Sequence, residues 1–215
     1  MNYHGQPVLE DLPLKLTLFA VLLVSLSIHE AAHAWSADKL GDSTARLLGR
    51  LTFNPIAHID PIGTLLLPGI AILTGLPIIG WAKPVPVNLH QLRHPRRDFM
   101  YIAAAGPASN LLQALVLAGA ARLMFPGGLE NTFAGILLIQ GIFLNVLLAL
   151  FNLIPVPPLD GGNVIGGLLP ERVADAYDRL VRPWGFLILY AILLSGLFSK
   201  LIVPPALTLT RMLLP

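Results

Sequence analysis

Four stretches of the chain are continuously apolar over a length that can cross a bilayer. The hydrocarbon core of a membrane is about 30 Å thick, so a spanning helix needs roughly 20 apolar residues. The four stretches are Leu14–Trp35, Phe99–Arg122, Phe133–Leu153 and Trp184–Val203. This pattern predicts an all-α integral membrane protein that passes through the bilayer several times.

A fifth apolar segment, Ile62–Gly80, is interrupted by Pro68-Gly69 and by Gly75–Pro77. Irregular backbone at membrane depth survives only where protein buries it or where it lines a cavity. We therefore expect about four to five transmembrane helices plus a re-entrant or broken membrane segment, with possible short β elements.

The composition agrees with a membrane protein and narrows its chemistry. Only 12% of the 215 residues are charged and 55% are hydrophobic, whereas soluble domains carry about 25% charged residues. The chain has no cysteine, which excludes a disulfide framework, a thiolate metal site and a cysteine nucleophile. A net charge of +2 gives no sign of a nucleic-acid partner. We expect one membrane-embedded domain over 1–215, with a core of about 14–169 and an accessory C-terminal span of about 184–203.

The first apolar stretch contains the motif H-E-x-x-H at His29, Glu30 and His33. Positions i and i+4 share one face of a helix, so both imidazoles can converge on one metal ion. Glu30 then lies beside the metal, where a carboxylate can take a proton from water. A chance spacing or a polar seam between helices is the alternative, but ionisable residues within a span are costly and usually functional.

A catalytic zinc site generally takes three protein ligands, so one more is needed. Asp160 is favoured because Pro155, Pro157 and Pro158 predict an extended chain before it, and Gly161-Gly162 a tight turn after it. An ordinary Asp-Gly turn at a loop tip is an equally good explanation of the spacing alone. The other candidates are Asp42, His58, Asp60, His90 and His94.

Several long motifs occur together and in order. They are HEAAHAW (29–35), AGPASN (105–110), FNLIPVPPLDGG (151–162), GRLTFNPIAHIDPIGT (49–64) and GWAKPVPVN (80–88). Over roughly Leu14 to Leu169 the chain resembles the site-2 protease family of intramembrane zinc metalloproteases. The resemblance is to the short bacterial branch, which lacks PDZ and CBS domains.

The resemblance implies a role for each matching residue. His29, His33 and Asp160 would bind one Zn²⁺ ion, and Glu30 would be the catalytic acid and base. Asn152 would contact the backbone of the substrate. The expected partners are transmembrane proteins or peptides as substrates and the lipid bilayer itself.

A shared metal constrains the topology. The helix that carries the H-E-x-x-H motif and the helix that precedes Asp160 must end on the same side of the bilayer. Ile62–Gly80 must therefore be re-entrant, or it must cross and be followed by an extended return through Gly80–Asn88. Ten basic residues then lie in the loops 36–98 and 154–182, and four lie on the opposite face. The positive-inside rule places the ten on the cytoplasmic side. We expect a bacterial cytoplasmic membrane protein whose site opens toward the cytoplasm.

Other polar or special residues in the spans have structural and functional interpretations. For Asn110 and Asn145 we expect a hydrogen bond between helices. Gly106-Pro107 predicts either a kink near the metal or simple close packing. His58 and Asp60 could orient a ligand imidazole, and a position at the lipid headgroups is an equal alternative.

The leading hypothesis is a zinc peptidase that cleaves transmembrane substrates near the cytoplasmic side. Because a membrane helix satisfies its own amides, the substrate must unwind. We expect the Ile62–Asn88 region to pair with it by strand addition. The alternatives are a metal-binding membrane transporter and a non-catalytic relative that only binds membrane proteins.

Overall fold

The computed structural model describes residues 12–74, 80–129 and 132–215, and every regular element in them is helical. No β-strand occurs among these described residues. The α-helices are α1 (Leu12–Leu40), α2 (Thr44–Leu47), α3 (Leu67–Thr74), α4 (Pro95–Met124), α5 (Phe133–Asn152), α6 (Asp160–Leu168), α7 (Glu171–Leu180), α8 (Gly185–Leu194), α9 (Leu197–Leu201) and α10 (Val203–Leu213). Short 3₁₀ helices cover Pro55–His58, Leu89–Gln91 and Arg182–Trp184, and a π-helix covers Pro61–Leu66.

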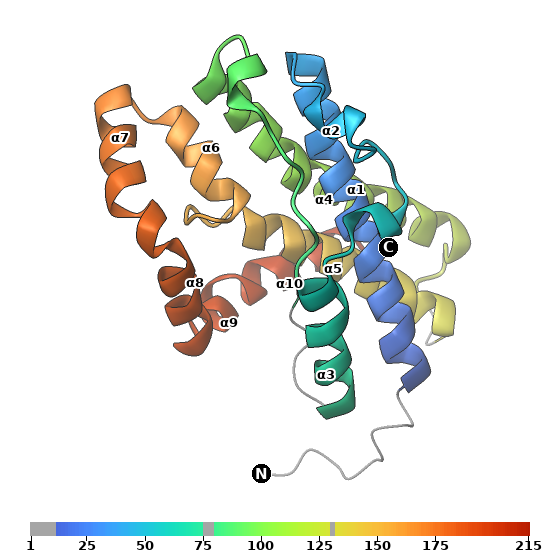
Figure 1. Cartoon of the computed structure of the whole chain (residues 1–215). Helices are drawn as coiled ribbons and strands as arrows, with labels where there is room; N and C mark the ends of the chain where they lie inside the picture. Colours follow the sequence, from blue (N-terminus) through green and yellow to red (C-terminus); the bar gives the residue numbers. More distant parts are fainter. Residues whose placement is uncertain (1–11, 75–79, 130–131) are drawn as a thin grey trace.

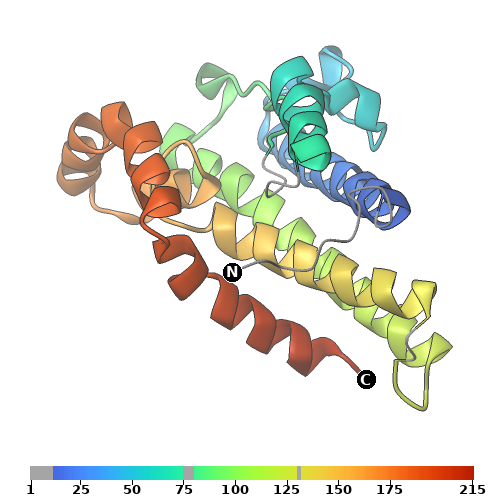
Figure 2. The same cartoon turned by 90° about the horizontal axis from the view of Figure 1, so that it is seen from below.

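Helices α1, α4 and α5 are each long and apolar enough to cross a membrane, as the sequence predicts. Helix α4 packs against both of the others, and α4 and α5 run alongside each other in opposite directions (Figure 2). Small buried residues at helical spacing let the backbones approach closely. On α4 these residues are Ala103, Gly106, Ala114, Ala118 and Ala121.

The predicted span Trp184–Val203 is not one straight helix. Helix α8 ends at Leu194, and Gly196 adopts a left-handed conformation with φ of +74° that only glycine adopts readily. The α7–α8 and α9–α10 portions meet at an angle of 72°, and together they would make a fourth span. Helix α10 then lies along α5, where Ala206 joins the core formed with Ile142 and Val146.

The fifth apolar segment enters the molecule and returns. From the π-helix at Pro61, α3 runs away from the end of the molecule where α1 finishes, and the extended segment Gly80–Asn88 runs back toward that end (Figure 1). The Trp81 N–H donates to the Gly63 carbonyl and the Lys83 N–H to the His58 carbonyl, which joins the two limbs. This path agrees with the expected return of the chain, which either a re-entrant segment or a crossing with an extended return would give. The predicted break at Gly75–Pro77 lies outside the described residues.

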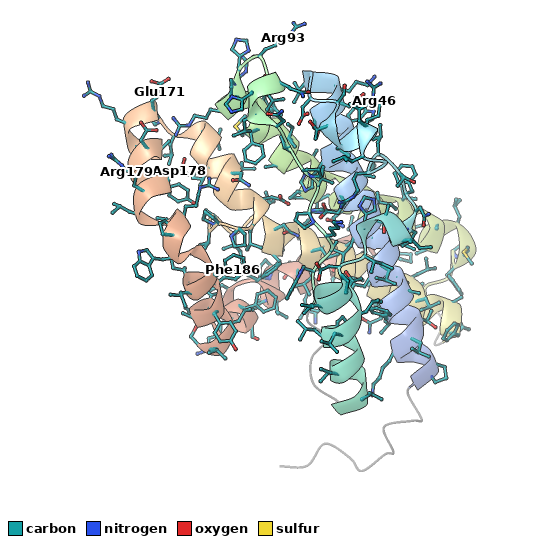
Figure 3. All side chains as sticks on the ribbon, in the orientation of Figure 1. Arg46, Arg93, Glu171, Asp178, Arg179 and Phe186 are labelled. Carbon is teal, nitrogen blue, oxygen red and sulfur yellow. The ribbon has the colours of Figure 1, made fainter. Side chains whose placement is uncertain are left out.

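Several charged side chains lie at the end of the molecule where α1 finishes and α4 begins (Figure 3). Arg46, Arg93 and Glu171 project from this end, whereas Phe186 lies further down on α8 (Figure 3). The molecule therefore has a polar end and an apolar body, as a protein that enters a bilayer requires.

Candidate metal centre

The two histidines of the H-E-x-x-H motif lie one turn apart on the buried face of α1. His29 and His33 are 4% and 8% exposed. Their rings meet edge to face with centroids 4.6 Å apart, and their Nε2 atoms are 3.0 Å apart. The i, i+4 spacing therefore brings both imidazoles to one point, as the sequence predicts.

Asp160 reaches the same point from the first turn of α6. Its Oδ2 lies 3.1 Å from the His29 Nε2 and its Oδ1 lies 3.4 Å from the His33 Nε2. Oδ2 is buried and accepts no hydrogen bond. Burial alone would raise the pKa of Asp160, but the neighbouring imidazoles lower it below its ordinary value. The ionised carboxylate is the form that binds a metal ion.

The three side chains fit a zinc ion. Tetrahedral zinc with ligand bonds of about 2.0–2.1 Å places any two ligand atoms about 3.3 Å apart. The His29 Nε2 lies 3.0 Å from the His33 Nε2 and 3.1 Å from Asp160 Oδ2, close to that spacing, and the other carboxylate oxygen, Oδ1, lies 3.4 Å from the His33 Nε2. Among the described parts of the chain, His29, His33 and Asp160 form the one cluster that could hold a metal ion.

Both imidazoles are oriented by hydrogen bonds at the opposite ring nitrogen. The His29 Nδ1–H donates to Asn110 Oδ1 at 2.6 Å, and the His33 Nδ1–H donates to the Ile102 carbonyl at 2.7 Å. Both Nε2 lone pairs therefore face each other. Each neutral ring therefore offers an Nε2 lone pair to a metal ion, and the two Nε2 atoms are 3.0 Å apart.

Asn110 is fixed in turn by a buried chain of hydrogen bonds across three helices. Its Nδ2 donates to Asn145 Oδ1 at 3.0 Å, and the Asn145 Nδ2 donates to Ser25 Oγ at 3.0 Å. The expectation that both asparagines form hydrogen bonds between helices is confirmed, and they bond to each other. The contact of Asn110 with His29 was not predicted, although an asparagine within an apolar span, at the end of the AGPASN motif, was the available signal.

Gly106 on α4 provides the space for the two imidazoles. A Cβ atom at this position would lie 2.4 Å from the His33 Nε2 and 2.5 Å from the His29 Nε2. Close packing is therefore the role of this glycine within α4. The ring nitrogens occupy the volume that any other residue would need.

The loop before α6 is packed tightly beneath Asp160. A Cβ atom on Gly161 would lie 2.3 Å from the Leu153 carbonyl oxygen, and one on Gly162 would lie 2.6 Å from the Pro157 nitrogen. These glycines belong to the first turn of α6, so the expectation that they form a tight turn was wrong. They are needed because the loop backbone approaches the helix closely. The Tyr177 hydroxyl, from α7, donates to the Pro155 carbonyl and fixes the loop from its other side.

Glu30, next to His29, is held by backbone. The Val85 N–H, in the extended segment Gly80–Asn88, donates to Glu30 Oε2 at 3.1 Å. The side chain is partly exposed. The residue predicted to be the base therefore contacts the re-entrant segment.

The other candidate ligands lie elsewhere. The His58 Nε2 pairs with the Thr52 carbonyl, and Asp60 accepts hydrogen bonds from the N–H groups that begin the π-helix. The suggestion that these two residues orient a ligand imidazole was wrong, because neither contacts one. Asp42 accepts from the Asn88 N–H at 2.6 Å. Burial would raise the pKa of Asp42, but hydrogen bonds from Thr44 and Asn88 lower it.

Asn152 ends α5, and its Nδ2 donates to the Leu148 carbonyl of its own helix. His90 belongs to a short 3₁₀ helix, and His94 precedes α4. Both histidines are exposed. None of these residues joins the metal cluster.

Comparison with known proteins supplies independent information. The profile of "Peptidase family M50" matches residues 127–196. The chain is 38% identical over 199 residues to the "Putative zinc metalloprotease YwhC" of Bacillus subtilis, covering 89% of this chain and 87% of that protein. It is 32% identical over 181 residues to the "Putative zinc metalloprotease Rip2" of Mycolicibacterium smegmatis, and the match covers 83% of this chain and 66% of that protein. No solved structure matches the chain significantly.

Proposed function

Because the chain belongs to peptidase family M50, the site-2 proteases, and is a zinc metalloprotease with several membrane helices, we propose that it cleaves transmembrane substrates within the bilayer. One observation supports this most strongly. His29, His33 and Asp160 converge inside the molecule, and both histidines come from a helix that is long and apolar enough to span the membrane.

The proposed zinc ligands are His29 Nε2, His33 Nε2 and the Asp160 carboxylate. Three protein ligands leave a fourth tetrahedral position open, which is the arrangement of a catalytic site. Zinc bound there supplies a Lewis acid that polarises a carbonyl and makes a water molecule more acidic. The hydrogen bonds from His29 to Asn110 and from His33 to Ile102 keep both rings in the ligating orientation.

Glu30 is the proposed general base. It follows a ligand histidine directly and remains partly exposed, so water can reach it. In this proposal Glu30 accepts a proton from the attacking water and then delivers it to the leaving amine. The Val85 N–H occupies one carboxylate oxygen, Oε2. Oε1 is therefore the oxygen proposed to carry the proton.

The extended segment Gly80–Asn88 is the proposed docking site for the unwound substrate. In an extended chain, alternate residues direct their N–H and C=O groups to opposite sides. The backbone groups of Trp81, Lys83 and Val85 form hydrogen bonds with other parts of the protein. The edge formed by Ala82, Pro84 and Pro86 has no hydrogen-bond partner in the described structure.

This free edge is mainly a row of acceptors. Pro84 and Pro86 have no N–H group, so only their carbonyls can pair with an added strand. A substrate that pairs here would contribute N–H groups at alternating residues. Asn152 is also proposed to contact the substrate backbone. An unwound membrane segment has such N–H groups to offer because its own helix no longer uses them.

The protein is a multi-pass membrane protein, and the basic loops support a site that opens toward the cytoplasm. We propose that it resides in the bacterial cytoplasmic membrane. We also propose that 1–215 forms one domain, with the metal and base carried by about 14–169.

The test combines zinc quantification with cleavage of a membrane-embedded peptide in liposomes. Asp160→Ala is expected to lose both zinc and cleavage. Glu30→Gln is expected to keep one zinc ion per chain and lose cleavage. A Glu30→Gln protein that still cleaves would overturn the assignment of the base, and zinc flux through that variant would favour a transporter.

A further inference from the structure

A buried cation that the zinc chemistry does not use lies behind the extended segment. Arg50 is 7% exposed, and no carboxylate in the described structure pairs with it. Its Nη2 donates to the Lys83 carbonyl and lies 3.4 Å from the His58 Nδ1, while its Nε has no partner. Burying a charge without a carboxylate partner destabilises the folded protein, so a functional role would explain why an arginine occupies this position.

Arg50 and His58 hold the Lys83 residue at both of its backbone groups. Arg50 binds the Lys83 carbonyl, and the His58 carbonyl accepts the Lys83 N–H at 2.9 Å. Asp42 binds the Asn88 N–H beyond it at 2.6 Å. The segment is therefore fixed in register at Lys83, and Val85 lies two residues further along the same edge.

The register matters because of the residues that flank Val85. Its N–H donates to Glu30 Oε2 at 3.1 Å. A shift of the segment by one residue in either direction would present Pro84 or Pro86 to Glu30. Neither proline has an N–H group, so the carboxylate would lose its donor entirely.

We propose that Arg50 and His58 are positioning residues that fix the Val85 amide, and that this amide orients the Glu30 carboxylate for proton transfer. The inference rests on the proposed role of Glu30 as the base. It assigns a function to the FNPIAHIDP stretch, which contains His58 and which the zinc ligands leave unexplained. The donor on Oε2 restricts the rotation of the carboxylate and leaves Oε1 free to accept a proton.

The first experiment removes the Val85 N–H alone. Replacing Val85 with its α-hydroxy acid converts the amide to an ester and keeps the side chain. Full-length enzyme in liposomes, with a transmembrane peptide as substrate, is expected to show kcat lowered about tenfold or more, because hydrogen bonds to charged groups are the strong ones. KM and zinc content are expected to stay as in the unmodified enzyme. Two encoded variants test the same bond, because Val85→Ala keeps the backbone N–H and Val85→Pro removes it. The kcat of Val85→Pro is therefore expected to be the lower of the two.

The second experiment asks whether Arg50 acts through that bond. Arg50→Met is expected to lower kcat by a similar factor, and Arg50→Lys, which keeps a donor for the Lys83 carbonyl, is expected to restore part of it. Combined with the ester at Val85, Arg50→Met is expected to cause no further loss, because both changes remove one interaction. Losses that multiply would overturn the inference, as would a loss of zinc.

The two proposals fail in different ways. If Glu30→Gln remains active, the proposed function is wrong whatever these variants do. If Glu30→Gln is inactive and the Val85 ester has the kcat of the unmodified enzyme, only the positioning role is wrong. The ester variant leaves Arg50 in place, so it decides the question even where Arg50→Met does not fold.

Discussion

The proposed zinc ligands and the proposed base are held by two different kinds of structure. His29, His33 and Asp160 are held by packed helices, by a glycine that makes room for them and by a buried chain of hydrogen bonds. Glu30 is held by one backbone amide of an extended segment, and hydrogen bonds with Arg50, His58 and Asp42 help to keep that segment in place. The difference suggests that metal binding and proton transfer can be disturbed separately.

The largest effect is expected on the helical side of this comparison. Gly106→Ala places a methyl group 2.4 Å from the His33 Nε2, which is too close for the ring to remain. We expect the purified protein to contain almost no zinc and to cleave nothing, as measured by elemental analysis and the liposome assay. Gly119→Ala is the matched control because it lies on the same helix with nothing within 4 Å of the added Cβ. Equal zinc contents in the two variants would contradict the packing argument.

Removing the hydrogen bond behind His29 should have a smaller effect of the same kind. Asn110→Ala frees the His29 Nδ1 and breaks the connection to Asn145. Partners of this type contribute about 10- to 100-fold to metal affinity. Competition with a zinc chelator should therefore show weaker binding by about that factor. The Val85 ester provides the comparison, because it is expected to leave zinc affinity unchanged, and a similar loss there would remove the distinction between the two regions.

If the substrate pairs with the free edge of Gly80–Asn88, its cleavage should depend on every second N–H group along the substrate. Replacing successive residues of the model peptide by α-hydroxy acids removes one N–H at a time. Hydrogen bonds contribute about 0.5–1.5 kcal/mol, so kcat/KM should fall roughly 2- to 10-fold at alternating positions and little between them. Esters also weaken the substrate helix, which would favour cleavage, so the alternation cannot come from unwinding. A uniform response along the peptide would contradict docking at the Ala82–Pro84–Pro86 edge.

The smallest expected effect is on the stability of the protein. It concerns Asp42, which accepts the Asn88 N–H at the end of the extended segment Gly80–Asn88. The pKa of Asp42 is lower in the folded state than in the unfolded state. Ionised Asp42 therefore stabilises the folded protein fully above the unfolded pKa of about 4. This stabilisation is lost as the pH falls through the folded pKa. Asp42→Asn should cost about 1 kcal/mol near neutral pH and remove that part of the acid sensitivity. Thermal unfolding in detergent, followed from about pH 3 to about pH 7, measures both the loss of stability at neutral pH and the change in acid sensitivity. The exposed Asp175→Asn is the control, since surface ion pairs contribute little.

The helical side of the molecule was largely predictable from the sequence. Long apolar runs predict α1, α4 and α5, and the i, i+4 spacing predicts the meeting of His29 and His33. The requirement that Asp160 reach the same metal predicts that the segment after α2 returns. These predictions succeed because helix periodicity and bilayer thickness are regular, so a local pattern fixes the geometry.

The remaining features depend on contacts between distant residues, which a local pattern does not contain. The break at Gly196 falls within an apolar run that is long enough to span. Gly161 and Gly162 look like a turn, but the loop backbone beneath them explains their presence. Arg50 looks like one of many basic loop residues until the Lys83 carbonyl is seen beside it. In each case the partner that gives the residue its role is separated from it in the sequence.

The two prolines of the extended segment have a further consequence for the protein in a crowded membrane. Unpaired strands tend to join identical strands on neighbouring molecules, and the result is aggregation. Two copies of the Pro84 and Pro86 edge would oppose oxygen to oxygen, and only Ala82 could bridge them. The same residues that leave the segment open to a foreign chain therefore discourage the enzyme from associating with itself.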